Sequence, residues 1–541
     1  MTRMIYSATV ALMLVCMVCL SPIHADTPSP DVLAGYHFAG LARWLNEPGG
    51  TRLKEILALP QTQALGRHVL DKLAHAPHAL FPQAIDDTQA TNGIPLIEPL
   101  LEDWIQHESF LEVRGPTGAT PGWIFGIAIP AERGVLWRKN LTDLMALWKL
   151  GTPATAEKDG MLITTVRNGS NPMLVRWCQF GDWLMLGVGI EPLGPWDKAL
   201  AAMRQSQRPC LALTDEGLIA ELNLARLAGS LGLPGNIAWP HATVNAAGRD
   251  EDIRLGARLF FSESATGPLE PWHVPTNIIQ EPLISFTAWR GARPWLNRLE
   301  ILPRLGISPA PNEVYFWAQS MSIPQTLLAF PAEDPTNRVR AMLDPCLELI
   351  PAAWRKRGLG QLEWRDADQQ LVWKALPLLF PHLRGGDDGG RGFITGGTFP
   401  ALHTTNPPPR ELLNQFVGKP DLIYYDWELT ARRLVQLRMQ AQLSTLITGK
   451  SILGTNTPPL PWLMEMEQHP GNSATEVIAV SPREWTLTRK SPVGLTATEL
   501  MGLMCWVESL DFPRFTFRFP DVVAPKLAPT SKSRPVPKRQ P

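Results

Sequence analysis

Four segments of the chain share one pattern of apolar and polar positions. In each, a short strand-like run leads into an Ala-Arg pair, and apolar residues at helical spacing follow. The segments read YHFAGLAR, IAELNLAR, FTAWRGAR and YDWELTAR, and they end at Arg43, Arg226, Arg293 and Arg432. A strand former stands six residues before each Ala, at Tyr36, Ile219, Phe286 and Tyr425. The pattern therefore predicts a short strand that runs directly into an amphipathic helix.

Other segments recur in the same order along the chain. GIAIPAE resembles LLAFPAE, RPCLAL resembles KPDLIY, and ATVNAAGRDEDIRLGAR matches ATEVIAVSPREWTLTRK without a gap. These segments occupy 126–132 and 327–333, 208–213 and 419–424, and 242–258 and 474–490. We interpret these recurring segments as an internal duplication in which insertions of unequal length have accumulated. The alternative is that strand–helix units of any α+β protein look alike.

Strands are predicted mostly in adjacent pairs rather than singly between helices. MLVRWCQFGDWLMLGVG turns at Gly181-Asp182, and QLEWRDADQQLVWKA turns near Asp366. This favours an α+β fold of antiparallel sheets with helices packed on one side over a doubly wound parallel sheet. A final helix is predicted to open with Thr496 and Glu499 as a capping box.

The ends and the middle of the chain set the predicted domains. The N-terminus combines Arg3, an apolar run and a small-residue cleavage site, which predicts a secretory signal peptide, with an uncleaved anchor as the alternative. The Pro-rich segment 262–282 predicts a seam, and no later stretch reaches transmembrane length. We therefore expect an exported protein, periplasmic or secreted. Its predicted parts are a signal peptide at 1–25, α+β halves at 26–270 and 271–521, and a disordered Pro/Lys/Arg-rich tail at 522–541.

Composition narrows the classes of function. The chain has 541 residues, 45% hydrophobic and 19% charged, with a formal net charge of −1. These values suit a globular chain with a sizeable core and give no support for a nucleic-acid partner. Beyond the signal peptide the cysteines are Cys178, Cys210, Cys346 and Cys505. They are too scattered for a disulfide framework, so we expect buried free thiols, with Cys178–Cys210 as the pair if one bridge forms.

One helical face carries a candidate metal site. His68, Asp71 and His75 stand at positions i, i+3 and i+7, and imidazole and carboxylate groups suit Zn²⁺ or another transition ion. These three side chains point away from the predicted apolar face of the helix. We expect Pro77 to end this helix. We therefore expect a solvated polar face here and neither a metal nor another cofactor.

One pair of carboxylates is a candidate for catalysis. Asp426 and Glu428 flank Trp427 in a predicted strand, so both fall on one face, about 6–7 Å apart, which suits a glycosidase acid–base pair. The alternative is a polar strand-to-helix junction in which Asp426 caps or ion-pairs locally. The chain has no G-x-S-x-G or H-E-x-x-H motif, no G-x-G-x-x-G that opens a helix, and no Cys–His pairing at motif distance.

Four distinctive stretches lie around and after the predicted seam. They read LEPWHVPTNIIQEPLISFTAWRG, NEVYFWAQS, DLIYYDWELTARRL and LTRKSPVGLTATEL. They resemble stretches of uncharacterised exported bacterial proteins that carry domains of unknown function. The resemblance covers most of the mature chain and is specific in the second half. It implies a bacterial envelope protein with an α+β fold, and it brings no assigned catalytic residues.

Three hypotheses for the function follow from these observations. The first is an exported, envelope-associated binding or scaffolding protein without enzymatic activity, whose partner is an envelope polymer or protein and whose ligand lies between the halves. The second is a hydrolase of a polysaccharide or other envelope polymer that uses Asp426 and Glu428. The third is a lipid carrier. A Trp-lined groove with paired carboxylates would favour the hydrolase, and an apolar tunnel between sheet and helices would favour the carrier.

Overall fold

The structure of the chain is a computed structural model. It describes residues 31–514, apart from 47–50, 81–84, 117–119, 159, 168, 170–171, 211, 214, 234, 320–324, 351–354, 357, 359, 377–378, 400–406, 449–450, 452, 455 and 470. The predicted signal peptide and the predicted C-terminal tail lie outside the described residues.

The first half of the chain alternates short helices with paired strands. In order, its elements are β1 (Val32–Phe38), α2 (Leu41–Trp44), α3 (Thr51–Ala58), α4 (Pro60–Leu80), α5 (Asp87–Gln106), β2 (Ser109–Arg114), β3 (Gly122–Ala128), α6 (Ala131–Leu147), β4 (Thr152–Lys158), β5 (Met161–Arg167), β6 (Met173–Phe180), β7 (Trp183–Ile190), α7 (Gly194–Ser206), β8 (Leu218–Asn223), α8 (Leu224–Leu227), β9 (His241–Arg249) and β10 (Asp252–Phe260).

The second half repeats this alternation with different helix lengths. In order, its elements are β11 (Leu283–Arg290), α9 (Arg293–Leu296), α10 (Ile301–Arg304), β12 (Glu313–Gln319), β13 (Gln325–Pro331), α11 (Pro335–Ala341), α12 (Leu343–Leu349), β14 (Gln361–Arg365), β15 (Gln370–Lys374), β16 (His382–Asp388), β17 (Arg391–Gly397), α14 (Arg410–Val417), β18 (Leu422–Leu429), α15 (Thr430–Thr448), α16 (Pro459–Met466), β19 (Asn472–Ser481), β20 (Glu484–Ser491) and α17 (Ala497–Glu508). The segment between β10 and β11 contains the predicted seam and forms neither helix nor strand.

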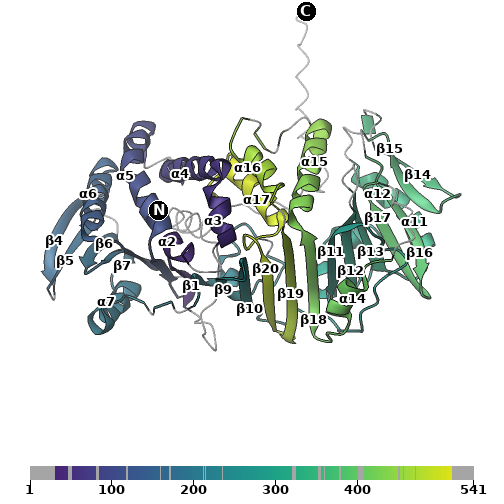
Figure 1. Ribbon diagram of the computed structural model, residues 1–541, viewed down its shortest axis with the longest axis horizontal. Helices are drawn as coiled ribbons and strands as arrows, with labels where there is room; N and C mark the ends of the chain where they lie inside the picture. Colours follow the sequence, from purple (N-terminus) through teal and green to yellow (C-terminus); the bar gives the residue numbers. More distant parts are fainter. Residues whose placement is uncertain are drawn as a thin grey trace, which may run out of the picture.

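All the strands join one 20-stranded antiparallel sheet (Figure 1). In the first half the strand order is β4-β5-β6-β7-β3-β2-β1-β8-β9-β10. In the second half it is β14-β15-β16-β17-β13-β12-β11-β18-β19-β20, which is the same order shifted by ten strands. The two edge strands β10 and β20 pair with each other and make the sheet continuous. The predicted mixed α+β fold with antiparallel strands is confirmed.

The four predicted strand-to-helix units occupy the middle of each half-sheet. They are β1 with α2, β8 with α8, β11 with α9, and β18 with α15. Strand β1 pairs with β8, and β11 pairs with β18, so the units lie side by side in two pairs. The predicted capping box at the start of α17 is also confirmed, because the Thr496 hydroxyl accepts from the Glu499 N–H and the Glu499 carboxylate accepts from the Thr496 N–H.

The side chains of each strand alternate between two faces of the sheet. We define face A as the side of the sheet that carries Tyr36, Ala220 and Leu255, and face B as the side that carries His37 and Ile219. Residues paired on neighbouring strands lie on the same face, so the register extends this assignment from strand to strand. By the same register, Asp426, Glu428 and Thr287 belong to face A of the second half, and Phe286 and Tyr425 to face B.

Helices cover both faces of the sheet, so the prediction that they pack on one side is wrong. On face A, Trp137 and Leu141 of α6 pack into the core of the first half. On face B, Trp196 and Leu200 of α7 pack against Phe110 of β2. In the second half, α11 lies on face A and α14 on face B. A sheet that is apolar on both faces needs a helical layer on each of them, which local sequence patterns did not reveal.

A cluster of helices connects the halves above the middle of the sheet, where Figure 1 shows α3, α4, α16 and α17 together. Leu65 of α4 packs with Trp462 of α16 and Met504 of α17. Helix α4 runs through Pro77 to its end at Leu80, so the prediction that Pro77 ends this helix is wrong. Pro77 stands one turn from the C-terminus, where the proline disturbs only the last turn.

Candidate functional site

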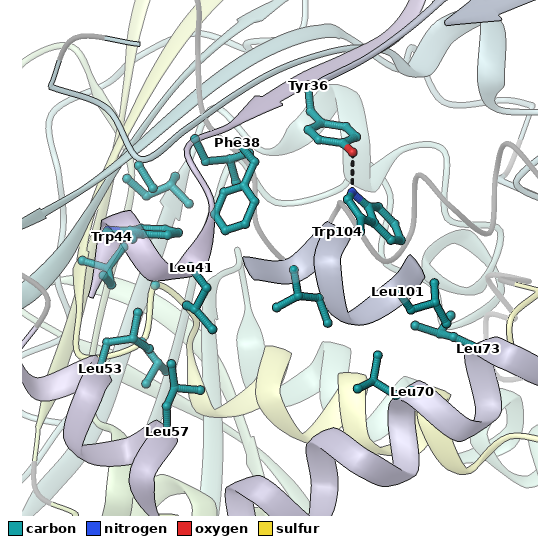
Figure 2. A pocket seen from close by; sticks show the side chains of 17 residues that line it. Tyr36, Phe38, Leu41, Trp44, Leu53, Leu57, Leu70, Leu73, Leu101 and Trp104 are labelled. Carbon is teal, nitrogen blue, oxygen red and sulfur yellow. Dashed lines mark hydrogen bonds between the residues drawn. The ribbon is translucent and has the colours of Figure 1, made fainter. Parts of the chain in front are cut away.

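An apolar cavity of about 280 Å³ lies on face A of the first half, between the sheet and the helices (Figure 2). Strands β1, β8, β9 and β10 form its floor, and α2, α3, α4 and α5 form its roof. The lining residues are Tyr36, Phe38, Leu41, Trp44, Leu53, Leu57, Leu70, Leu73, Leu101, Trp104, Ile105, Leu218, Ala246, Ile253, Leu255, Val493 and Gly494. None of these residues is charged. We call this space cavity 1.

The few polar atoms in the wall of cavity 1 are mostly paired with one another. The indole N–H of Trp104 donates to the Tyr36 hydroxyl at 2.6 Å, as Figure 2 shows. The indole N–H of Trp44 is buried and has no hydrogen-bond partner among the described residues. A wall of hydrocarbon and aromatic groups with satisfied hydroxyls excludes water and favours an apolar occupant.

Two glycines place the aromatic part of this wall. Gly40 turns the chain from β1 into α2 with φ +87°, and a Cβ there would lie 2.6 Å from the carbonyl oxygen of Gln106. A Cβ at Gly217 would lie 2.9 Å from the ring of Trp44, so this glycine makes room for the indole. The sequence therefore brings α2 close to the sheet and leaves Trp44 packed across the strand ends.

Helix α5 is fixed at both ends, which holds the roof of cavity 1 in place. Its N-terminus has a capping box between Asp86 and Gln89. Near its C-terminus the buried Asp103 accepts a hydrogen bond from the indole of Trp137 at 2.8 Å and pairs with Arg133. Since a buried carboxylate needs such partners, this contact ties α5 to α6 and stabilises the spacing between helix and sheet.

Charged groups stand one residue outside the lining of cavity 1. Asp252, next to the lining residue Ile253, pairs with Arg52 of α3 at 3.3 Å and with Lys490 of β20 at 3.0 Å. The Arg52–Asp252 pair holds one end of α3 against β10, and the Lys490–Asp252 pair joins β10 to β20. Arg52 therefore places a positive charge beside the apolar interior of cavity 1.

Two further cavities lie among the described residues. Cavity 2, of about 870 Å³, is on face B of the first half beneath α7, and it includes polar residues such as His37, Arg208 and Cys210. A third cavity, of about 400 Å³, is on face A of the second half near Leu328. Its lining residue Phe316 is 39% exposed, so this cavity is more open to water at that point. Cavity 1 differs from the expected cleft between the halves, because the second half adds only Val493 and Gly494 to its lining.

The two predicted catalytic carboxylates point from β18 toward the start of α17. Glu428 is 4% exposed, and its Oε1 accepts a hydrogen bond from the N–H of Ala497, the first residue of α17, at 2.6 Å. Asp426 accepts from the Thr287 hydroxyl at 2.6 Å. Neither residue lines any of the three cavities. Glu428 thus caps a helix N-terminus, where a carboxylate is favourable.

Burial shifts the ionisation of both carboxyl groups. The loss of water around Glu428 raises its pKa to about 7, and the charge of Asp426 adds to this effect. The N–H of Ala497 and the charge of Arg433 oppose it. Burial also raises the pKa of Asp426, which the hydrogen bond from Thr287 partly offsets. Two neighbouring carboxyl groups with raised pKa values are typical of a catalytic acid–base pair, but here both groups lie beneath a helix.

The structure does not bring the predicted metal ligands together. His68 Nε2 lies within hydrogen-bond distance of Glu508 of α17, at 3.1 Å, so it lies at a helix interface rather than in solvent. His75 contacts Asp71 at 3.6 Å on the exposed side of α4. In the described part of the chain there is no group of three or more His, Cys, Asp or Glu side chains that could hold a metal ion. The described thiols are free, and no bond joins Cys178 to Cys210.

Comparisons with known proteins do not assign this chain to a family. No family model, no curated protein and no solved structure matches this chain. Among the described residues, no helix is both long and apolar enough to cross a membrane. The sites of this chain are therefore what indicates its function.

Sequence patterns missed the residues that line cavity 1. The relevant signal was the long amphipathic region between β1 and β2, which has no counterpart of similar length between β11 and β12. That region supplies α3, α4 and α5, and these helices make the roof of the cavity. The available pointer to the site was therefore a helical region that the first half has and the second half lacks at the corresponding place in the strand order.

Proposed function

We propose that this chain is an exported protein that binds the hydrocarbon chain of a lipid in cavity 1. The observation that carries the proposal is the uncharged lining between the sheet and helices α2 to α5. Apolar surface that is withdrawn from water is stabilised by about 25 cal/mol per Å². A hydrocarbon chain in cavity 1 would be shielded by side chains on both sides, which suits a binding or carrier role.

The size of the cavity sets the size of the occupant. A volume of about 280 Å³ is roughly twice the ~150 Å³ of an engineered apolar cavity that holds benzene. A medium-length acyl chain fits this space, whereas a sugar polymer would leave its hydroxyl groups without partners. The cation Arg52, next to the lining residue Leu53, suits an acidic head group beside the cavity.

The hydrolase remains the second hypothesis, with Asp426 and Glu428 as its acids. A feature in its favour is the raised pKa of both groups. Against it, Glu428 already accepts the N–H of Ala497 and is 4% exposed, so a substrate would have to displace α17 to reach it. Export to the periplasm or the medium and attachment to the envelope are parts of the proposal that rest on the N-terminal sequence.

We further propose that the two halves arose by internal duplication. The identical strand order supports this, as does the position of the repeated segments on corresponding strands. Segments 242–258 and 474–490 are offset by 232 residues, which relates Gly256 to Thr488, and these two residues pair directly across β10 and β20. Two equal half-sheets joined through such a pair have the geometry of a twofold symmetric dimer.

Calorimetric titration of the mature chain with laurate tests the binding proposal. We expect one saturable site and a negative heat-capacity change, because apolar surface is buried. Ala246→Leu, which fills the floor of cavity 1, should abolish binding. Ala242→Leu, on the same strand and face but outside the lining, is the matched control and should leave binding intact. Absence of laurate binding by the wild-type chain, or equal binding by the Ala246→Leu variant, would overturn the proposal.

A further inference from the structure

Cavity 2 is lined by a cysteine and a histidine, and a carboxylate outside the lining hydrogen-bonds the histidine, so three distant segments meet here. It lies on face B of β8, β1 and β2, beneath α7, and has a volume of about 870 Å³. His37 comes from β1, Glu108 immediately precedes β2, and Cys210 follows α7. The Cys210 sulfur lies 3.8 Å from Nδ1 and 3.7 Å from Nε2 of His37. The sequence contains no local Cys–His motif, because these residues are far apart in the chain.

The hydrogen bonds around Glu108 fix the orientation of the imidazole. His37 Nε2 lies 2.8 Å from Glu108 Oε1, and Arg208 donates a short hydrogen bond to the same oxygen. Burial raises the pKa of Glu108, but the hydrogen bond from His37 and the charge of Arg208 outweigh it and hold the pKa below its usual value. Glu108 is therefore an ionised acceptor, so His37 Nε2 must carry the proton and donate it.

This tautomer leaves the lone pair of His37 Nδ1 free to accept the thiol proton of Cys210. Burial raises the pKa of Cys210 to about 12, so the resting group is a thiol rather than a thiolate. A protonated thiol is a weak nucleophile unless a base removes its proton during attack. His37 is within reach of the sulfur, and Glu108 would stabilise the imidazolium that forms.

We propose that Cys210 is a nucleophile that accepts an acyl group from a carboxylic ester or thioester, with His37 as its general base and Glu108 as a positioning residue. The Cys210 sulfur forms a bond to the acyl carbon while His37 takes the thiol proton. The bond from that carbon to the leaving oxygen or sulfur breaks, and His37 returns the proton to the leaving group. Water then attacks the thioester by the same route, giving the carboxylic acid and restoring the thiol. The step needs no oxidant or reductant.

A donor for the developing oxyanion is present in the same segment. The Nε–H of Arg208, two residues before Cys210, is buried and has no acceptor among the described residues. A buried donor without an acceptor is costly in the resting protein and becomes favourable once negative charge develops nearby. The guanidinium is held by Glu108 and stacks over Trp183 at 5.6 Å, so it does not need to be ordered during the reaction.

In the second half, aromatic side chains fill the corresponding position among the described residues. On face B, Ala288 stands between Tyr425 and Tyr315 in the pairing register, where His37 stands between Ile219 and Phe110 in the first half. Tyr315 and Tyr425 are fully buried in an aromatic core beneath α14. The open, polar cavity is therefore a property of the first half rather than a consequence of the shared strand order.

Acylation of the full mature chain by p-nitrophenyl acetate tests this proposal independently of lipid binding. We expect a burst of p-nitrophenol and an acetyl group on Cys210, located by peptide mass spectrometry. Cys210→Ala should abolish the burst, and His37→Gln, which keeps a donor for Glu108, should slow acylation roughly 10²–10³-fold. Cys346→Ala, which removes a half-buried thiol on α12, is the control and should change nothing.

The pH dependence of the acylation rate separates a positioning role of Glu108 from a role in folding. Glu108→Gln should lower the apparent pKa of the acylation rate, because the imidazolium of His37 loses its carboxylate partner. A folded wild-type chain that takes no acetyl group on Cys210, or that labels Cys346 as fast as Cys210, would overturn the proposal. Equal acylation rates for the wild type and a folded His37→Gln variant would also overturn it.

Discussion

On face A, the central strands of the two halves carry opposite kinds of side chain. In the first half, Tyr36 of β1 stands beside Ala220 of β8, and the space above them is apolar. In the second half, Thr287 of β11 stands beside Asp426 of β18, with Glu428 two residues further on. The strand order is the same, so the order of the strands does not decide where a cavity forms. The side chains and the helices between β1 and β2 do.

On face B the two halves differ in how completely the space between sheet and helix is filled. The first half leaves cavity 2 between α7 and the sheet, whereas the second half fills the corresponding layer with Phe416 of α14, Tyr425 and Phe286. The first half therefore has a cavity on each face, whereas the second half has a cavity on face A and a tightly filled layer on face B. In the second half this filled layer provides a solid core.

The largest expected effect is on the free energy of unfolding, and it distinguishes the filled layer of face B in the second half from the open layer in the first half. Phe416→Ala removes a fully buried ring and should lower the free energy of unfolding by about 3–5 kcal/mol. Ile219→Ala, at the edge of cavity 2, should cost only about 1 kcal/mol, because this side chain is half-buried. Urea unfolding measures both values, and equal losses would show that the two layers do not differ as described.

The next effect concerns the buried acids of the second half. The pKa of Glu428 rises from 4.5 to about 7 in the folded chain, so the folded state keeps a proton that the unfolded state has lost between these pH values. Stability should therefore fall by up to about 3 kcal/mol as the pH rises through this range. Glu428→Gln keeps an acceptor for Ala497 and should remove most of this dependence. If the free energy of unfolding of the Glu428→Gln variant fell between pH 5 and 8 as steeply as that of the wild type, this expectation would be contradicted.

A smaller effect compares one hydrogen bond from face A of each half. Tyr36→Phe leaves the indole N–H of Trp104 without its acceptor, and Thr287→Val leaves Asp426 without its donor. Each should cost about 1–3 kcal/mol, because a buried polar group loses its partner. Only Thr287→Val should make stability more dependent on pH, since it changes the environment of a carboxyl group. Thermal unfolding at two pH values distinguishes them.

The smallest effect lies at the mouth of cavity 1. Arg52→Met removes an exposed partner of Asp252, which keeps Lys490. The free energy of unfolding should change by less than about 1 kcal/mol. Laurate titration should nevertheless show weaker binding at low salt, because a cation near the head group is lost. Identical laurate affinity in the variant would place the head group elsewhere.

Local sequence patterns predicted much of the secondary structure and little of its assembly. The strand-to-helix units at Arg43, Arg226, Arg293 and Arg432 are present, as are the β6–β7 and β14–β15 hairpins, because alternation and turn residues act over short distances. The pairing of β10 with β20 joins segments far apart in the chain, and no local signal reports such a contact. The same holds for the helices that cover face B.

The candidate sites show the same limit. Alternation correctly placed Asp426 and Glu428 on one face, but it could not show that α17 would cover them. His37 and Cys210 were not recognised, because 173 residues separate them. Differences between the halves were informative, yet the useful difference was the inserted helices after β1 rather than the carboxylates of β18.

The central claim is that cavity 1 holds a hydrocarbon chain. A crystal structure of the mature chain with an ω-bromo fatty acid tests it most directly, because anomalous scattering locates the bromine without reference to the protein. We predict one bromine peak inside cavity 1, between the Tyr36–Trp104 pair and Ile253. A well-occupied fatty acid whose bromine lies outside cavity 1, or an empty cavity at saturating ligand, would contradict the account.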